Sequence, residues 1–97
     1  MRVVHRDRRL ERMDRERRGD GSFELAVVRA FLKCMDLIRA APNTQALRAF
    51  KSRRLEKLKG NRSHQHSMRL NNQWRLILEI EDGDEPTATI VEIDDYH

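Results

Sequence analysis

The chain has 97 residues, of which 38% are hydrophobic, and its 20 Lys and Arg outnumber 16 Asp and Glu to give a formal net charge of +4. This length suits one small domain spanning residues 1–97, which can bury roughly 60–65% of its unfolded surface. The only cysteine, Cys34, excludes an internal disulfide and a metal site built from cysteines. No apolar run is long enough for a signal peptide or a membrane span, so we expect a cytoplasmic protein without membrane contact.

Basic and acidic residues are segregated along the chain. Residues 1–75 hold all 20 Lys and Arg against 8 Asp and Glu, a net charge of +12, whereas residues 76–97 hold 8 acids and no Lys or Arg, a net charge of −8. A basic body of this size favours nucleic-acid phosphate as the partner. The alternative is that many of these charges are ordinary solvated helix surface.

The N-terminal part predicts a short strand followed by a highly charged helix. Residues 2–5 suit an edge strand, and residues 6–18 suit a helix that contacts the body only through Leu10 and Met13. Gly19 and Gly21 end this helix. Its arginines are expected to be solvated or paired with acids three or four residues away, namely Asp7, Glu11, Asp14 and Glu16.

A long apolar helix follows and is expected to form the core. Ser22 is its predicted N-cap. Apolar side chains recur on one face with the helical period: Phe23, Val27, Ala30, Phe31, Cys34, Leu37, Ile38 and Ala41. Cys34 on this face is interpreted as a small buried hydrophobic residue rather than a nucleophile.

Proline ends the core helix at Pro42, and a second, shorter helix is expected directly afterwards. Asn43 or Thr44 can cap it, and the spacing of Leu47 and Phe50 predicts that both face inward. Residues 51–54 then form a basic link to the second half of the chain.

Two strands joined by a tight loop are predicted from a period of two. Apolar and polar residues alternate over residues 67–71 and again over residues 74–81. A loop of three residues, 71–73, places the apolar side chains of both strands on one face, whereas a loop of two would separate them. The expected pairs are Leu70 with Trp74, Met68 with Leu76, and Arg69 with Arg75.

The facing arginines Arg69 and Arg75 require a counter-charge. Two guanidinium groups in this position repel each other by a few tenths of a kcal/mol to about 1 kcal/mol. A phosphate could supply the negative charge, because the planar arginine fork matches its oxygens. A carboxylate from the last strand could supply it equally well, and spacing alone does not decide between them.

The C-terminal part predicts an acidic turn at residues 82–86 and a last strand at residues 87–94. Alternation places Val91 and Ile93 on one side of this strand and Ala88 and Ile90 on the other. The strand leads to Asp95, Tyr96 and His97, which form either a last packing contact or a site.

His64 and His66 lie in a polar loop without acidic or cysteine companions at ligand spacing, so they are interpreted as surface residues and no metal site is expected.

Four motifs at these separations resemble the HigB branch of the RelE/ParE superfamily of toxin–antitoxin toxins. They are LEKLKGNR at residues 55–62, SMRLNNQWR at residues 67–75, EDGD at residues 81–84 and DYH at residues 95–97. Each motif is weak alone, but the combination is specific and spans essentially the whole chain. The resemblance implies an α+β, RelE-like fold, with N-terminal helices packed on a small antiparallel sheet and the C-terminal strand central.

The same resemblance implies a ribosome-dependent endoribonuclease that enters the ribosomal A site and cuts mRNA there without a cofactor. The ribose 2′-OH attacks the adjacent phosphate, so the enzyme must remove one proton, donate another and stabilise the extra charge on the phosphorane. The implied partner is a HigA-like antitoxin with a helix-turn-helix domain, and operator DNA is bound only through that antitoxin.

Site residues follow from the resemblance, position by position. Lys59, Arg69 and Arg75 would hold and polarise the phosphate, Asp95 and His97 would transfer protons, and Tyr96 would stack on a base, a contact worth on the order of 1–3 kcal/mol. Arg54, Lys57 and Arg62 would contact RNA phosphates. Glu56 departs from the pattern, since some HigB relatives carry histidine three residues before this lysine. A carboxylate there can act as a base but supplies no positive charge.

A second hypothesis is a binding module without catalysis, or a ParE-like inhibitor of gyrase. It is motivated by Glu56 and by the lack of any catalytic motif that is independent of the family resemblance. Cleavage of mRNA on ribosomes supports the first hypothesis. Growth arrest with intact mRNA and gyrase-linked DNA damage supports the second.

Overall fold

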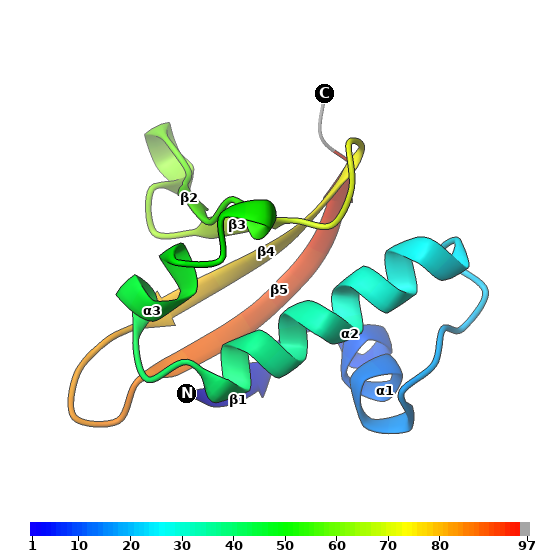
Figure 1. Cartoon of the computed structure of the whole chain (residues 1–97), viewed down its shortest axis with the longest axis horizontal. Coiled ribbons are helices and arrows are strands. Elements are labelled where there is room, and N and C mark those ends of the chain that lie inside the picture. Colours follow the sequence, from blue (N-terminus) through cyan, green and yellow to red (C-terminus); the bar gives the residue numbers. More distant parts are fainter. Residues whose placement is uncertain (96–97) are drawn as a thin grey trace.

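A computed structural model describes residues 1–95 and shows a five-stranded sheet with helices packed against it (Figure 1). The strands are β1 (Arg2–His5), β2 (Glu56–Lys57), β3 (His66–Arg69), β4 (Trp74–Glu81) and β5 (Thr87–Asp95). The helices are α1 (Arg8–Glu16), α2 (Leu25–Ala40) and α3 (Thr44–Arg48), with 3₁₀ turns η1 (Lys51–Arg53) and η2 (Gly60–Arg62).

The sheet order is β1-β5-β4-β3-β2, so β5 lies inside the sheet between β1 and β4. The first strand, β1, runs parallel to β5, and the remaining neighbours are antiparallel. The predicted α+β, RelE-like arrangement is confirmed, with β1 as the expected edge strand. The parallel β1–β5 pair makes the sheet mixed rather than wholly antiparallel.

The β3–β4 hairpin has the predicted register. Its pairs include Met68 with Leu76 and Arg69 with Arg75. Asn71 shapes the loop, because its side-chain oxygen accepts hydrogen bonds from the backbone amides of Gln73 at 2.8 Å and Trp74 at 2.7 Å. The apolar members of the hairpin therefore face the core, and the two arginines lie on the opposite face of the sheet.

A bulge in β5 changes which residues of the last strand face the core. The register shifts there, since Leu78 pairs with Ile90 while Ile77 pairs with Glu92. Val91 is thus an extra residue, and the alternation beyond it is reversed. Ile93 packs against the core on the same side as Ala88 and Ile90. The prediction that Ile93 lies on the side opposite these two residues is wrong, because an inserted residue is invisible to strict alternation.

The buried side chains of α2 confirm it as the core helix. They are Val27, Val28, Ala30, Phe31, Cys34, Met35 and Ile38. The predicted cap at Ser22 is wrong, because α2 begins three residues later with Glu24 as its N-cap. The Ser22 amide instead donates to the Asp20 side chain at 2.9 Å, and its hydroxyl accepts from Arg9 at 3.2 Å. In the described part of the chain, no helix is both long and apolar enough to cross a membrane.

Helix α1 contacts the core through Leu10 and Met13, as predicted, and both side chains are buried. Of its acids, Glu11 pairs with Arg15 at the expected spacing of four residues, whereas Glu16 pairs with Arg15 and Arg18, which are only one and two residues away. Asp7 does not pair with a nearby arginine. It caps the helix, because its carboxylate accepts from the backbone amides of residues 9 and 10.

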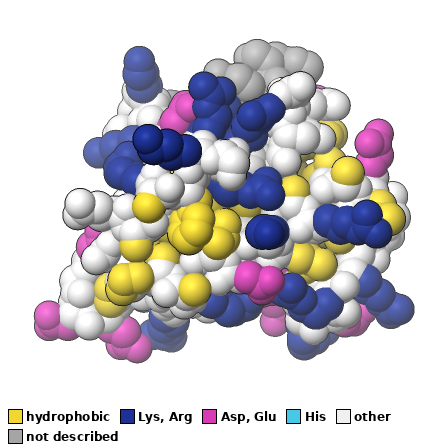
Figure 2. Space-filling model, viewed as in Figure 1, with side chains coloured by type: hydrophobic (Ala, Val, Ile, Leu, Met, Phe, Trp, Pro, Cys, Tyr) yellow, Lys and Arg dark blue, Asp and Glu magenta, His cyan; other side chains and the backbone are white. Residues whose placement is uncertain are grey.

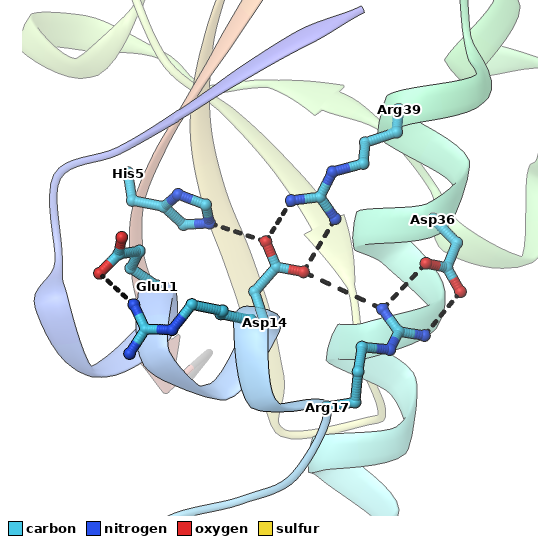
Figure 3. Close-up of polar contacts among 7 residues, drawn as sticks. His5, Glu11, Asp14, Arg17, Asp36 and Arg39 are labelled. Atoms are coloured by element: carbon cyan, nitrogen blue, oxygen red, sulfur yellow. Dashed lines mark hydrogen bonds and ion pairs between the residues drawn. The ribbon is translucent and has the colours of Figure 1, made fainter.

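The acid of α1 with the most partners is Asp14, which is buried (Figure 3). It accepts hydrogen bonds from His5 Nε2 of β1 at 2.9 Å and from both terminal nitrogens of Arg39 of α2. Arg17 approaches it at 4.0 Å and also forms a bidentate pair with Asp36 at 2.9 Å. Asp14 thereby connects three elements that are distant in sequence.

The short helix α3 is capped by Asn43, as expected, and its Leu47 is buried. Phe50 was predicted to face inward, and this is wrong, because it is 41% exposed. The reason is that α3 ends at Arg48, so the helical spacing that relates Leu47 to Phe50 does not continue.

Cys34 is fully buried, and burial raises the pKa of its thiol to about 11. We expect a thiol-reactive disulfide reagent at pH 8 to modify the native protein at least roughly 100-fold more slowly than the urea-unfolded protein, because the thiolate is both scarce and inaccessible. Absorbance of the released thiolate gives both rates. Equal rates would contradict the buried position.

Candidate functional site

The face of the sheet that carries the two facing arginines also carries a pocket of about 460 Å³. It lies between the sheet and the segment that runs from β2 into η2. Its lining residues are Glu56, Lys57, Leu58, Lys59, Arg62, Ser67, Arg75, Ile77 and Asp94. The pocket therefore brings together five of the residues selected from the sequence: Glu56, Lys57, Lys59, Arg62 and Arg75.

The floor of the pocket comes from three adjacent strands. Cross-strand pairing aligns Ser67 with Ile77 and Arg75 with Asp94, which places all four side chains on one face of the sheet. Arg75 is only 8% exposed, and one of its terminal nitrogens donates to Ser67 Oγ at 3.5 Å. Arg75 and Ser67 both carry hydrogen-bond donors on this floor, and such donors are suited to an anion.

The wall of the pocket is the segment of residues 56–62. Gly60 has φ +68°, a left-handed conformation that allows the chain to turn into η2, and Lys59 directly precedes it as the N-cap. Lys57 and Lys59 are exposed, and neither forms an ion pair within residues 1–95. Glu56 pairs with Ser67 and is exposed at the rim.

Arg62 closes one side of the pocket and makes several contacts. Its Nε donates to the side-chain oxygen of Gln65 at 2.9 Å. Its terminal nitrogens lie 3.6 Å from Asp94 and 3.8 Å from Glu92. These two ion-pair distances exceed the 2.7–2.9 Å of a strong charge-assisted hydrogen bond.

Among residues 1–95, the lining carries four cations and two carboxylates, Glu56 and Asp94, which gives these described lining residues a net charge of +2. The sequence left open whether a phosphate or a last-strand carboxylate balances the charge of Arg69 and Arg75. Asp94 of β5 is the strand partner of Arg75, which partly answers this question. Asp94 and Glu56 together balance only two of the four cations in the described lining. Converging Lys and Arg side chains with excess positive charge are suited to a phosphate group.

Three predicted site residues do not line the pocket. Arg69 lies opposite Arg75, but its guanidinium bonds to the hairpin loop, to Asn72 and to the carbonyl of residue 71. Arg54 is exposed in a left-handed conformation with φ 45° just before β2. Asp95 pairs with Trp74, so it belongs to the core side of the strand, and it accepts from Gln73 at 3.2 Å. Tyr96 and His97 lie outside the described residues.

The sequence interpretation did not select Asp94, Ser67 or Ile77 as site residues. Ser67 and Ile77 follow from the predicted hairpin register, since each occupies the face that carries Arg69 and Arg75. Asp94 could not be found in this way, because the bulge at Val91 decides that Asp94, rather than its neighbour Asp95, lies on the pocket face.

Lys and Arg side chains gather on the upper part of the surface shown in Figure 2, over β2 and β3. Exposed cations lie along residues 48–59, the part of the chain that leads into the pocket wall and includes it. They are Arg48, Lys51, Arg54, Lys57 and Lys59. A surface of this kind attracts a polyanion, and the attraction weakens as salt is added.

Of the two histidines expected in a polar loop, His64 is exposed as predicted, but the prediction for His66 is wrong, because it begins β3 and is half-buried. His64 is exposed and lies 3.6 Å from Glu79, whereas burial and the nearby Arg48 and Lys57 lower the pKa of His66. Among residues 1–95, no group of three His, Cys, Asp or Glu side chains is placed to hold a metal ion.

Comparison with known proteins identifies the family. Residues 5–97 match the family described as "RelE-like toxin of type II toxin-antitoxin system HigB". The chain belongs to this family. Membership in the HigB-like toxins assigns the protein a toxin role and implies a partner antitoxin. No curated protein matches the chain.

Among solved structures, the fold of this HigB-like chain is similar to that of the YoeB/ParE toxin from Agrobacterium tumefaciens. The TM-score is 0.61 and the sequence identity 20%, and the alignment covers 100% of both chains. At this identity the similarity concerns the fold alone. The match of residues 5–97 to the HigB-like family confirms the family resemblance inferred from the four motifs.

Proposed function

We propose that this HigB-like toxin is an endoribonuclease that cuts mRNA on the ribosome. The observation that carries the proposal is the pocket, in which Lys57, Lys59, Arg62 and Arg75 converge beside the carboxylate of Glu56. Four cations from two separate segments of the chain can bind one phosphate and its neighbours. The cytoplasm, where ribosomes and mRNA are found, is the corresponding location.

The reaction forms a bond between O2′ of the ribose and the adjacent phosphorus, and it breaks the bond between phosphorus and O5′. The products are a 2′,3′-cyclic phosphate and a 5′-OH. Lys59 and Arg75 would stabilise the added negative charge of the phosphorane. Glu56 at the rim would accept the proton of the 2′-OH, since its carboxylate faces the same pocket.

The remaining roles rest on the family resemblance. His97 would donate the proton to the departing 5′-oxygen, Tyr96 would stack on a base, and Asp95 would assist proton transfer indirectly. Arg54 and Arg69 would contact RNA phosphates beside the pocket. The antitoxin is proposed to be a HigA-like helix-turn-helix protein that brings the complex to operator DNA.

The test is cleavage of mRNA on programmed ribosomes. We expect the wild-type protein to produce fragments with 2′,3′-cyclic phosphate ends. His97→Ala should cleave about 10²–10⁴-fold more slowly, which is the usual contribution of a general acid. Fragment sequencing and end-group analysis measure both quantities. His64→Ala is the matched control, because His64 is exposed outside the pocket and should leave the rate unchanged.

Two outcomes would contradict the proposal. Undiminished cleavage by His97→Ala and by a chain lacking residues 95–97 would exclude the proposed acid. Growth arrest with intact mRNA, accompanied by gyrase-linked DNA damage, would favour the ParE-like alternative instead.

A further inference from the structure

A chain of side-chain hydrogen bonds runs from the segment after β1 to the wall of the pocket. Arg6 forms a bidentate pair with Glu79 of β4, with both distances 2.9 Å. Glu79 accepts from the Gln65 amide nitrogen at 3.1 Å, and the Gln65 oxygen accepts from Arg62 Nε at 2.9 Å. The chain thus links Arg6, Glu79, Gln65 and Arg62 in that order.

The partners in this hydrogen-bond chain determine which end of the Gln65 side-chain amide faces Glu79 and which faces Arg62. A carboxylate can only accept, so Glu79 must face the NH₂ end of Gln65, and the oxygen end is left to face Arg62. The hydrogen bonds from Arg6 and Gln65 lower the pKa of Glu79 to about 2, so the carboxylate stays ionised at neutral pH. Gln65 itself is only 8% exposed, which restricts it to this geometry.

As a result, Gln65 holds the Arg62 guanidinium through one nitrogen, Nε. Gln65 occupies Nε, whereas the two terminal nitrogens approach Asp94, which lines the pocket, at 3.6 Å and Glu92 at 3.8 Å. Two parallel N–H groups in this arrangement match two oxygens of a phosphate. An incoming phosphate can displace the loosely held carboxylates without breaking the bond to Gln65.

We infer that Gln65 is a positioning residue for RNA binding, because it holds Arg62 with its terminal nitrogens directed at an RNA phosphate. Glu79 and Arg6 act through Gln65 by fixing the orientation of its amide. The inference rests on the phosphate-binding part of the proposed function and extends it to three residues that do not line the pocket.

The test is the salt dependence of RNA binding, which counts phosphate contacts. A fluorescein-labelled single-stranded oligonucleotide with 2′-methoxy groups is suitable, because it cannot be cleaved by attack of a 2′-OH. Loss of one phosphate contact lowers the slope of log affinity against log salt by about 0.7. We expect Arg62→Ala and Gln65→Met each to lower the slope by about that amount, as measured by fluorescence anisotropy.

A double variant separates positioning from general structural damage. If Gln65 acts through Arg62, Gln65→Met should cause no further loss of slope in the Arg62→Ala background. Glu79→Gln, which changes a more exposed residue, should lower the slope by a smaller amount. Gln45→Met makes the same chemical change on exposed α3 and should retain the wild-type slope.

A wild-type slope in both Gln65→Met and Glu79→Gln would overturn the inference, as would additive losses in the double variant or a wild-type protein that does not bind the oligonucleotide. The proposed function fails differently. A wild-type protein that binds RNA with the expected slopes but leaves ribosomal mRNA intact would exclude the nuclease and leave the role of Gln65 in place.

Discussion

Replacement of Lys59 by Gln is expected to slow mRNA cleavage on ribosomes by on the order of 10²–10³-fold, the usual effect of removing one donor from a group that stabilises an oxyanion. Lys59 lines the pocket beside the buried Arg75 and has no ion-pair partner within residues 1–95. Within residues 1–95 its charge is therefore not neutralised by an ion pair, and we expect it to act on the phosphorane. Single-turnover cleavage rates on programmed ribosomes measure the effect.

The matched control is Lys33→Gln, which removes an exposed lysine of α2 that does not line the pocket. It should cleave at the wild-type rate. Because Lys59 is exposed, the substitution should also leave the melting temperature almost unchanged. A Lys59→Gln protein that cleaves within a few-fold of the Lys33→Gln rate would remove Lys59 from the proposed machinery.

A comparison at Arg75 distinguishes charge from shape. Arg75→Lys retains the positive charge on the floor but loses the planar fork that can bind two phosphate oxygens. We expect cleavage by Arg75→Lys to lie below the wild type and above Arg75→Ala in the same assay. Equal rates for the two variants would indicate that the guanidinium geometry, rather than the charge, is what the pocket requires.

The parts of the fold that the sequence predicted well are those fixed by local rules. The β3–β4 register followed from a period of two and a loop of three residues, and it placed Arg69 opposite Arg75 as observed. The core helix followed from a period of 3.6, and the Asn43 cap from a short polar side chain after proline. Each signal lies within a few residues of the feature it predicts.

The parts that could not be predicted depend on contacts distant in sequence. The bulge at Val91 appears in the pairing of β5 with β4, and nothing in the residues of β5 alone indicates it. One inserted residue exchanged the faces of Asp94 and Asp95, so the carboxylate in the pocket differs from the one that the family motif suggested.

In the candidate site, too, the features that depend on contacts distant in sequence could not be predicted. Glu56, Lys57, Lys59 and Arg62 were expected from the family resemblance, which their short shared segment carries, and Arg75 was expected from the resemblance and from the hairpin register. The hydrogen bonds among Arg6, Glu79 and Gln65 could not be expected, because they form only when β4 and the segment at Arg6 come together in the fold. Hydrogen-bond partners separated by 73 residues leave no pattern in a single sequence.

Replacement of Asp14 by Asn is expected to destabilise the fold by about 2–4 kcal/mol. Hydrogen bonds to a charged group are worth about 1.5–3 kcal/mol each, and removal of one partner of a buried pair usually costs about 3–5 kcal/mol. Arg39 is 45% exposed, so it can turn partly to water and reduce the loss. For a chain of this length the melting temperature should fall by about 10–25 °C.

The matched control is Asp36→Asn at the exposed end of the same network, where the acid is 59% exposed and pairs with Arg17 (Figure 3). Exposed ion pairs contribute about 0–1 kcal/mol, so this variant should melt within a few degrees of the wild type. Equal losses in the two variants would contradict the claim that burial of Asp14 determines its contribution.

The dependence of stability on pH gives an independent measure of the same carboxylate. Burial raises the pKa of Asp14, but the hydrogen bonds and charges of Arg39 and His5 outweigh burial, so its pKa in the folded protein lies below the ordinary value. The unfolded chain then binds a proton more readily, and the stability that Asp14 contributes is present above pH about 4 and is lost as the pH falls through the folded pKa. The difference in unfolding free energy between the wild type and Asp14→Asn, measured by urea titration, should therefore be constant from pH 7 to about 5 and shrink below about 4. A difference that stays constant down to pH 2 would mean that Asp14 stabilises the fold through packing rather than through its charge.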